Sequence, residues 1–350
     1  MMVPVEIPDK LNGKTFYGEI LPSIYNSIIQ GDYLIDFDMH RTKLANPEGL
    51  VNLLASAAMI RSKSGYIPQL LCLPENPNLF EYMRRTGFFK WATVPGCESL
   101  KFHGIMSNDF DDEYRRPSYF RPQLYGLYTH SSEGTTFNRH IRHVEDFVMA
   151  IADSLAGNHI DSQEISRYCR TLSLSLVQVI KNSLEHNNGY RGTLAYYMMQ
   201  KTPYNTIEFA FSDIGQGFLE RMKTMLKEKD EEAIKKYGEF EQKLNNKDLL
   251  FKAHDDNPNL LAITKAVDYR ENSEIPGLHK IKVFLLKYGK LLSIHSGNYS
   301  VEYELMKMEN HEKEVLIRTI FHDSSYFSGC HLKIVFNLPE PTKEKQYGVE

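Results

Sequence analysis

Short apolar runs and helical stripes alternate along the first hundred residues. The run at 33–37 predicts a buried strand, and a wide apolar stripe over 50–60 predicts a helix. An asparagine–proline pair stands before that helix, as is typical of an N-cap and a first helical position. A second apolar run at 68–73 precedes a shorter helical pattern over 76–87. Strands and helices in this order predict a small α/β domain.

The pattern changes at about residue 101. Residues 101–142 are charged, rich in turn-forming residues and poor in periodicity, so we expect a linker region there. Helical spacing resumes at Val144 and ends at Gly157, and a longer helical stripe follows over 162–186. Two consecutive helices after a linker indicate a second domain that begins near residue 143.

Strand patterns and one charged segment make up the rest of the chain. Residues 193–198 and 207–212 predict two strands, and the turn between them predicts an antiparallel hairpin. Residues 219–256 are rich in Lys and Glu with few apolar positions, which is typical of a solvated helical insertion. The remaining elements that we expect are a helix over 278–288 and strands at 291–294 and 332–336.

Composition and charge argue against nucleic-acid-binding, membrane-spanning and secreted proteins. The chain has 350 residues, 41 basic and 45 acidic side chains, and a formal net charge of −4. A chain with this slightly acidic balance lacks the excess of basic side chains that binds nucleic-acid phosphates, so nucleic-acid binding is not expected. No apolar run approaches the ~20 residues that span a bilayer, and the N-terminus lacks the pattern of a secretory signal. The four cysteines form no CxxC pair, so we expect a cytoplasmic protein with no membrane partner.

The most informative polar residues lie near the end of the long helix and after the hairpin. Gln178 and Asn182 are four residues apart and share one helix face, and Glu185 extends that stripe. Polar residues on an otherwise apolar helix indicate a hydrogen-bond partner or a ligand, because burying a polar group without a partner costs free energy. The hairpin runs into Asp213, with Gly215 and Gly217 behind it. This order places a carboxylate beside backbone that a flat ligand can approach closely.

In this order the motifs resemble those of the GHKL ATPases, a superfamily with gyrase-type topoisomerases, histidine kinases and anti-sigma-factor kinases. Lys181-Asn182-Ser183 is similar to the N box, and Asp213-Ile214-Gly215-Gln216-Gly217 is similar to the first glycine box. Pro276-Gly277-Leu278, with the helix and strand behind it, is similar to the second glycine box. Gly329-Cys330 and the apolar strand after them resemble the closing strand. The resemblance covers about 160–339.

The resemblance implies an ATP·Mg²⁺ site in a two-layer α+β sandwich with a mixed sheet. Asp213 would accept a hydrogen bond from the adenine amino group, and Asn182 would supply an oxygen to Mg²⁺. Gly277 and the helix that it opens would offer N–H groups to phosphate. The charged insertion would correspond to the ATP lid, at about 219–276, which orders over nucleotide. The nucleotide-binding residues so implied are Asp213, Gly215, Gly217, Asn182, Gln178, Gly277, Leu278 and Cys330.

Three positions depart from the family pattern. Members that hydrolyse ATP carry Glu four residues before the Asn, whereas this chain has Gln178, whose amide cannot take a proton from water. Of the two glycines usual in the second glycine box only Gly277 is present, and Cys330 stands where Thr is common. A catalytic role would therefore fall to Glu185, one helical turn from Asn182, or to a residue outside the motif.

Residues 30–95 resemble a STAS-type domain, the fold of the anti-anti-sigma factors. The resemblance rests on the segments 34–37, 46–50 and 71–74. Phosphorylated members carry a Ser at the start of the helix, where this chain has Glu48. A permanent negative charge suits a helix N-terminus but cannot be switched by phosphorylation.

Less specific interpretations stay open at this point. Asp213 could cap a turn, and Gln178 with Asn182 could lie on a solvated helix face. His140 and His143 are three residues apart, but no acidic or cysteine ligands at matching spacing accompany them. We therefore expect this pair on a polar surface or in a partner contact. The cysteines are expected to be buried small hydrophobic residues.

The sequence thus predicts a smaller STAS-like α/β domain at 1–100, a linker region at 101–142, a GHKL-type ATP-binding domain at 143–340 and a tail at 341–350. The expected function is an ATP·Mg²⁺-binding regulator whose nucleotide state orders the lid and controls a protein partner. An active ATPase or protein kinase of the GHKL type, and a nucleotide-independent interaction scaffold, are the alternatives. A homodimer is a further option, because related ATPases often dimerise.

Overall fold

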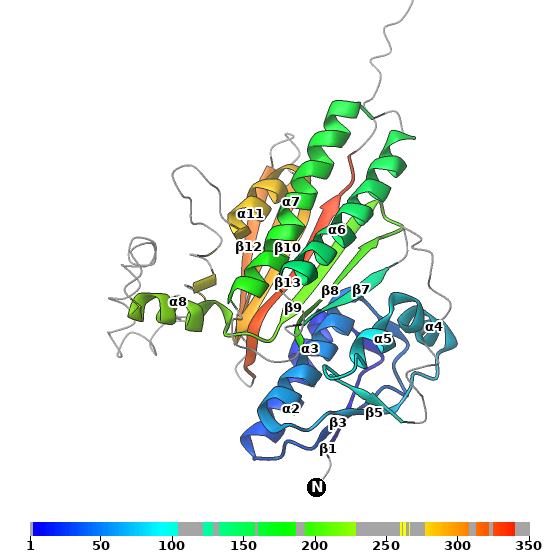
Figure 1. Ribbon diagram of the computed structural model, residues 1–350, viewed down its shortest axis with the longest axis vertical. Coiled ribbons are helices and arrows are strands. Elements are labelled where there is room, and N and C mark those ends of the chain that lie inside the picture. Colours follow the sequence, from blue (N-terminus) through cyan, green and yellow to red (C-terminus); the bar gives the residue numbers. More distant parts are fainter. Residues whose placement is uncertain are drawn as a thin grey trace, which may run out of the picture.

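The computed structural model contains two main sheets, and in Figure 1 the elements of the smaller sheet lie together below the larger one. The chain up to Phe102 builds the smaller sheet, which with its helices is called the N-terminal part below. The later elements build the larger sheet and its helices. The structure describes residues 3–103, 122–128, 133–157, 160–186, 193–228, 260, 262–263, 266, 277–307, 313–321 and 325–339.

The smaller sheet is parallel and has the strand order β1-β3-β5-β6. Its strands are β1 (Val3–Glu6), β3 (Ile35–Asp38), β5 (Gln69–Cys72) and β6 (Lys101–Phe102). The short strands β2 (Lys10–Leu11) and β4 (Leu44–Ala45) form a separate parallel pair. The helices are α1 (Gly13–Thr15), the π-helix η1 (Phe16–Ile20), α2 (Leu21–Ile29), α3 (Pro47–Ser64), α4 (Pro77–Thr86) and α5 (Phe88–Ala92).

Asparagine caps start the two helices that the sequence predicts in this part. Asn46 Oδ1 accepts a hydrogen bond from the N–H of Gly49 at 2.8 Å, which satisfies one donor of the first turn of α3. Asn76 Oδ1 accepts in the same way from the N–H of Asn78 at 2.9 Å. Helix α4 ends at Gly87, whose φ of 81° is the left-handed conformation usual after a helix. Both predicted helices and the strands before them are confirmed.

The larger sheet has the strand order β12-β11-β10-β13-β9-β8-β7 and is antiparallel in all its described pairs. The predicted hairpin is confirmed, because β8 and β9 pair directly. The expected mixed sheet is wrong here, because β13 lies between β9 and β10 and runs opposite to both. The strands are β7 (Gln123–Tyr128), β8 (Thr193–Lys201), β9 (Thr206–Asp213), β10 (Gly289–Gly297), β11 (Tyr299–Lys307), β12 (Lys313–Phe321) and β13 (Phe327–Asn337).

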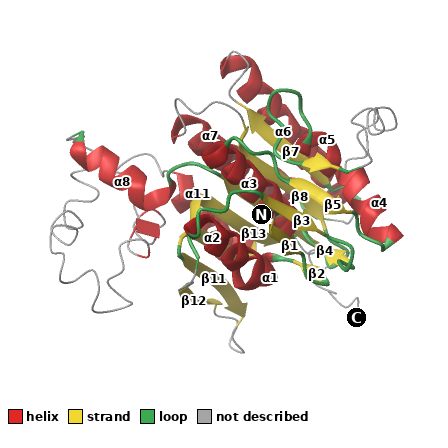
Figure 2. Cartoon of the chain, turned by 90° about the horizontal axis from the view of Figure 1, so that it is seen from below, coloured by secondary structure: helices red, strands yellow, loops and turns green. Residues whose placement is uncertain are grey.

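The central strands of the larger sheet are covered on both faces, whereas side chains of the edge strand β12 are exposed. Helices α6 (Glu133–Ala156), α7 (Ser162–His186) and α11 (Gly277–Tyr288) cover one face (Figure 1). Helix α3 packs against the other face, over β8 and β9, and lies over the larger sheet in Figure 2. Along β8, Tyr197 belongs to the helix-side core and Tyr196 to the core of the N-terminal part. Alternate side chains of one strand therefore join two different cores.

The region expected as a linker contributes to the larger sheet. Strand β7 pairs with β8 and forms one edge, and α6 begins at Glu133, well before the predicted start at Val144. Phe137 and Ile141 continue the helical spacing back from Val144, but polar residues surround them and the apolar pattern is therefore weak there. The rest of the expected linker, 104–121, lies outside the described residues.

The predicted lid is described only at its beginning. Helix α8 (Gly217–Lys227) contains its first residues. From residue 229 to 276 the prediction lies outside the described residues, apart from 260, 262–263 and 266, and so does the tail at 341–350.

The described chain has a mixed α/β architecture, with one parallel and one antiparallel main sheet, and this class was predicted. The GHKL-type and STAS-like assignments are finer than this class and stay predictions. Within the described ranges, no helix combines the length and the apolar character that a membrane crossing requires.

Candidate functional site

Asp213 ends strand β9 on the face that the helices cover. Phe209 and Phe211 of β9 belong to the helix-side core, and Asp213 follows at the same two-residue spacing. It pairs with Ala195, near the start of β8, and is only 7% exposed. The carboxylate therefore lies on the helix side at one end of the larger sheet.

Two backbone N–H groups hold one oxygen of this carboxylate. Gly215 and Cys330 each donate to Asp213 Oδ1 at 3.0 Å. Among the described residues, no group is hydrogen-bonded to Oδ2. Burial raises the pKa of Asp213 to about 6, although the two N–H donors act in the opposite direction. One oxygen is thus fixed by the protein, and the other is able to accept from a ligand.

Two glycines allow close backbone packing around Asp213. Gly217 and Gly329 have φ of 72° and 104°, in the left-handed region that favours glycine. A Cβ on Gly329 would lie 2.0 Å from the carbonyl oxygen of Asp213. A Cβ on Gly217 would lie 2.7 Å from Ser296 Oγ and 2.8 Å from the carbonyl oxygen of Gly329. The first glycine box and the closing strand of the resemblance are therefore in contact.

Ser296, on β10, connects these segments and was not predicted as a site residue. Its Oγ donates to the carbonyl of Gly329 at 2.8 Å and accepts from the N–H of Phe218, in the first turn of α8, at 3.3 Å. The side chain is buried. A serine in a strand carries no signal by itself, and its role becomes visible only when β10 pairs with β13.

Gln178 and Asn182 are brought together on α7. Gln178 Nε2 donates to Asn182 Oδ1 at 2.8 Å, and both residues are half-buried, so neither lies on a fully solvated helix face. Helix α7 packs on the face that carries Asp213. The link from α7 to β8 is only 187–192, so the two elements end at most ~25 Å apart. The C-terminal end of α7 and Asp213 therefore lie toward the same end of the sheet.

The other predicted site residues are described in their backbone only. Gly277 is the first residue of α11, which packs against α7, and this helix start was predicted. The side chains of Glu185 and Leu278 lie outside the described residues. Where side chains are described, no group of three or more His, Cys, Asp or Glu is arranged to hold a metal ion. The assignment of Mg²⁺ to Asn182 stays a prediction.

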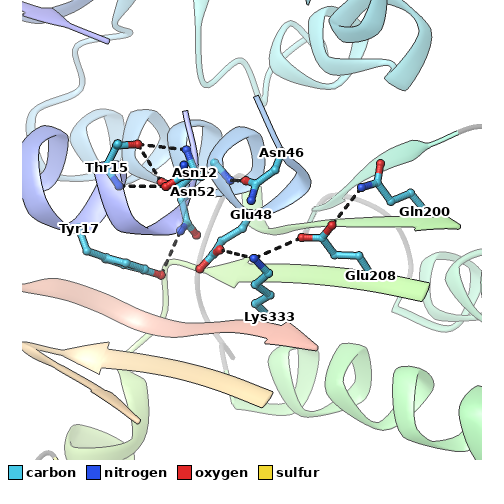
Figure 3. A network of polar contacts seen from close by, with 10 residues as sticks. Asn12, Thr15, Tyr17, Asn46, Glu48, Asn52, Gln200, Glu208 and Lys333 are labelled. Atoms are coloured by element: carbon cyan, nitrogen blue, oxygen red, sulfur yellow. Dashed lines mark hydrogen bonds and ion pairs between the residues drawn. The ribbon is translucent and has the colours of Figure 1, made fainter. Parts of the chain in front are cut away.

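A second polar cluster lies between the N-terminal part and the larger sheet (Figure 3). Glu48, in the first turn of α3, lies 3.2 Å from Lys333 Nζ on β13, and Glu208 lies 3.5 Å from the same nitrogen. Gln200 donates to Glu208 at 3.0 Å. Burial raises the pKa of Glu48, and Lys333 opposes that effect. Burial alone would lower the pKa of Lys333, but the two carboxylates outweigh it and raise the pKa.

Two secondary expectations are wrong. His140 is buried and hydrogen-bonded to a tyrosine hydroxyl at 2.8 Å, and the ring of His143 stacks on another tyrosine. Aromatic side chains of β7 and β8 cover this pair, so it does not form a polar surface. Cys72 is exposed, because it lies at the end of a strand of the smaller sheet, whereas Cys97 and Cys169 are buried as predicted.

Comparison with protein-family models, with curated protein sequences and with solved structures finds no match for this chain. The likeness to GHKL ATPases and STAS-type domains therefore rests on the motifs of the sequence. The functional interpretation rests on those motifs and on the geometry around Asp213.

Proposed function

We propose that this chain binds ATP with Mg²⁺ at the end of the larger sheet and that nucleotide occupancy controls a protein partner. The observation that carries the proposal is the environment of Asp213. Two backbone N–H groups bind one carboxylate oxygen, and the other is left for a ligand donor. The exocyclic amino group of adenine is such a donor.

The glycines beside Asp213 bring two segments of the proposed site together. A Cβ on Gly329 would lie 2.0 Å from the carbonyl oxygen of Asp213 and 2.8 Å from its Oδ1, so only glycine lets the start of β13 pack this closely against Asp213. Gly217 likewise has no room for a Cβ. The two glycines therefore fix the segments that would form the wall of the adenine site.

Helices α7 and α11 supply the groups for the phosphates and the cation. The backbone N–H groups at the start of α11, at Gly277, suit a phosphate. Asn182 would supply an oxygen to Mg²⁺, which also keeps phosphate and water ligands. Gln178 donates to Asn182 and cannot act as a general base, which favours nucleotide sensing over hydrolysis.

Control of a partner would use helix α8, which follows the first glycine box. The N–H of Phe218 is held by Ser296, which also donates to the carbonyl of Gly329 beside Asp213, so a ligand at Asp213 would act on the first turn of α8 through these two residues. This helix begins the segment that the sequence predicts as the ATP lid. Ordering of that segment over nucleotide would change the surface offered to a partner.

Calorimetric titration of the full chain tests the proposal. We expect heat of binding with a non-hydrolysable ATP analogue and with ADP, weaker binding without Mg²⁺, and weaker binding of the corresponding guanine nucleotide. Guanine presents a carbonyl oxygen where adenine presents its amino group, and that oxygen would face the Asp213 carboxylate. No heat at millimolar ligand would reject nucleotide binding and favour the interaction scaffold. Phosphate release that Glu185→Ala abolishes would favour the active ATPase instead.

A further inference from the structure

Strands β9, β10 and β13 each contribute one residue to the candidate site on the helix side of the larger sheet. The residue before or after it on each strand lies on the opposite face. Because side chains alternate along a strand, these neighbours point toward the N-terminal part. Each of them is almost fully buried. The neighbouring pairs are Asp213 with Ser212 on β9, Ser296 with His295 on β10, and Cys330 with His331 on β13.

Aromatic residues of η1 pack on this opposite face. The Tyr17 ring stacks on His295, with centroids 4.2 Å apart and 17° between the ring planes. The Phe16 ring lies 5.4 Å from the ring of Phe327, which stacks on His331 at 3.7 Å. The N-terminal part therefore contacts β10 and β13 directly beneath the candidate site.

Hydrogen bonds join the two histidines to the segments of the site. His331 Nδ1 is hydrogen-bonded to the hydroxyl of Ser212, and its Nε2 lies 3.0 Å from the carbonyl of Ser328. His295 Nε2 lies 3.0 Å from the carbonyl of Gly297. The segment 327–331 thus carries both the Phe327 ring that contacts Phe16 and the Cys330 N–H that binds Asp213.

We propose that Phe16 and Tyr17 are positioning residues for Asp213, so that ligand binding at Asp213 and docking of η1 on the sheet stabilise each other. This inference rests on the proposed function and makes the N-terminal part the regulator of that site. Both events require one conformation of the segment 327–331 and of the end of β10 at 295–296, so whichever occurs first removes part of the entropy cost of the other. Linkage makes the effect reciprocal between the two sites.

Tyr17→Ala tests this coupling against a matched tyrosine. Tyr82 also packs between the N-terminal part and the larger sheet, but its hydroxyl donates to Gln200. Gln200 is five residues along β8 from Ala195, the residue that pairs with Asp213. We expect Tyr17→Ala to weaken binding of a non-hydrolysable ATP analogue on the order of tenfold in calorimetry. Tyr82→Ala should leave the affinity unchanged. Tyr17→Phe keeps the ring and loses only the hydroxyl that accepts from Asn52, so it should retain wild-type affinity.

Hydrogen exchange on the wild-type chain gives a second readout that needs no variant. We expect the ATP analogue to slow exchange of the backbone amides over 16–20. Equal losses of affinity in Tyr17→Ala and Tyr82→Ala would overturn the coupling. Unchanged exchange over 16–20, with the analogue bound by calorimetry, would overturn it too and leave the proposed function intact. Absence of binding to the wild type would reject the proposed function and the coupling together.

Discussion

Asp213 combines burial with an incomplete set of hydrogen bonds, an arrangement that costs stability and suits ligand binding. A buried carboxylate prefers more than two hydrogen bonds, and here both go to one oxygen. Burial raises its pKa to about 6, against an ordinary value of 3.8. Strongly shifted groups of this kind concentrate at functional sites.

Binding of an adenine nucleotide should weaken as the pH falls from 7 to 5. Above about pH 6 Asp213 is ionised and accepts strongly, whereas below it the carboxyl group is protonated. The affinity should therefore fall by up to about tenfold for each pH unit below 6. Calorimetric titrations with ADP over this range measure the effect. The same series on Asp213→Asn shows how much of the change in affinity comes from protonation of ADP itself. Parallel profiles for the two proteins would contradict the role of Asp213.

Sequence motifs identified the residues that the structure brings together around Asp213, because glycines behind a strand-ending Asp are a local pattern. Gly215, Gly217 and Cys330 all lie in this cluster. Their roles toward a nucleotide stay predictions. Ser296 could not be found in this way, because its contacts depend on which strands are neighbours in the folded sheet.

At the scale of elements, the sequence predicts a helix or hairpin correctly where the residues that begin and end it lie within the same segment. The Asn-capped helices α3 and α4 and the β8–β9 hairpin are of this kind. Strand β7 is not, because its burial comes from elements distant in sequence. Its Tyr128 ring stacks on Trp91 of α5, and the strand also pairs with β8. Neither contact leaves a periodic pattern in 123–128.

Lys333→Met should destabilise the fold by about 3–5 kcal/mol, because it leaves two buried carboxylates without their cation. Glu48 comes from α3 and Glu208 from β9, so the variant weakens the contact between the N-terminal part and the larger sheet. Lys43→Met is a matched control, since it removes only the exposed ion pair with Asp9. That change should cost less than about 1 kcal/mol. Urea unfolding measures both variants, and similar small losses would show that the cluster is not a buried ion network.

At the scale of the whole molecule, the two parts of the chain share one sheet. The candidate nucleotide site lies on the helix-side face of this sheet, and the N-terminal part packs against the other face. Local patterns in the chain indicate two modules but not this docking. Tyr17, Glu48 and Lys333 are far apart in the chain and ordinary when taken singly. A nucleotide bound on one face, as proposed, would therefore have a direct route to the N-terminal part on the other.

The most direct test of the account is a calorimetric titration of Asp213→Asn and Asp36→Asn beside the wild type. Asp36 is the matched control, because it is also buried and accepts a backbone N–H, from Gln69 at 2.7 Å, but it lies in the smaller sheet. Asp213→Asn should weaken binding of the ATP analogue by about 1–3 kcal/mol, whereas Asp36→Asn should leave it unchanged. Wild-type affinity in a folded Asp213→Asn protein would contradict the account.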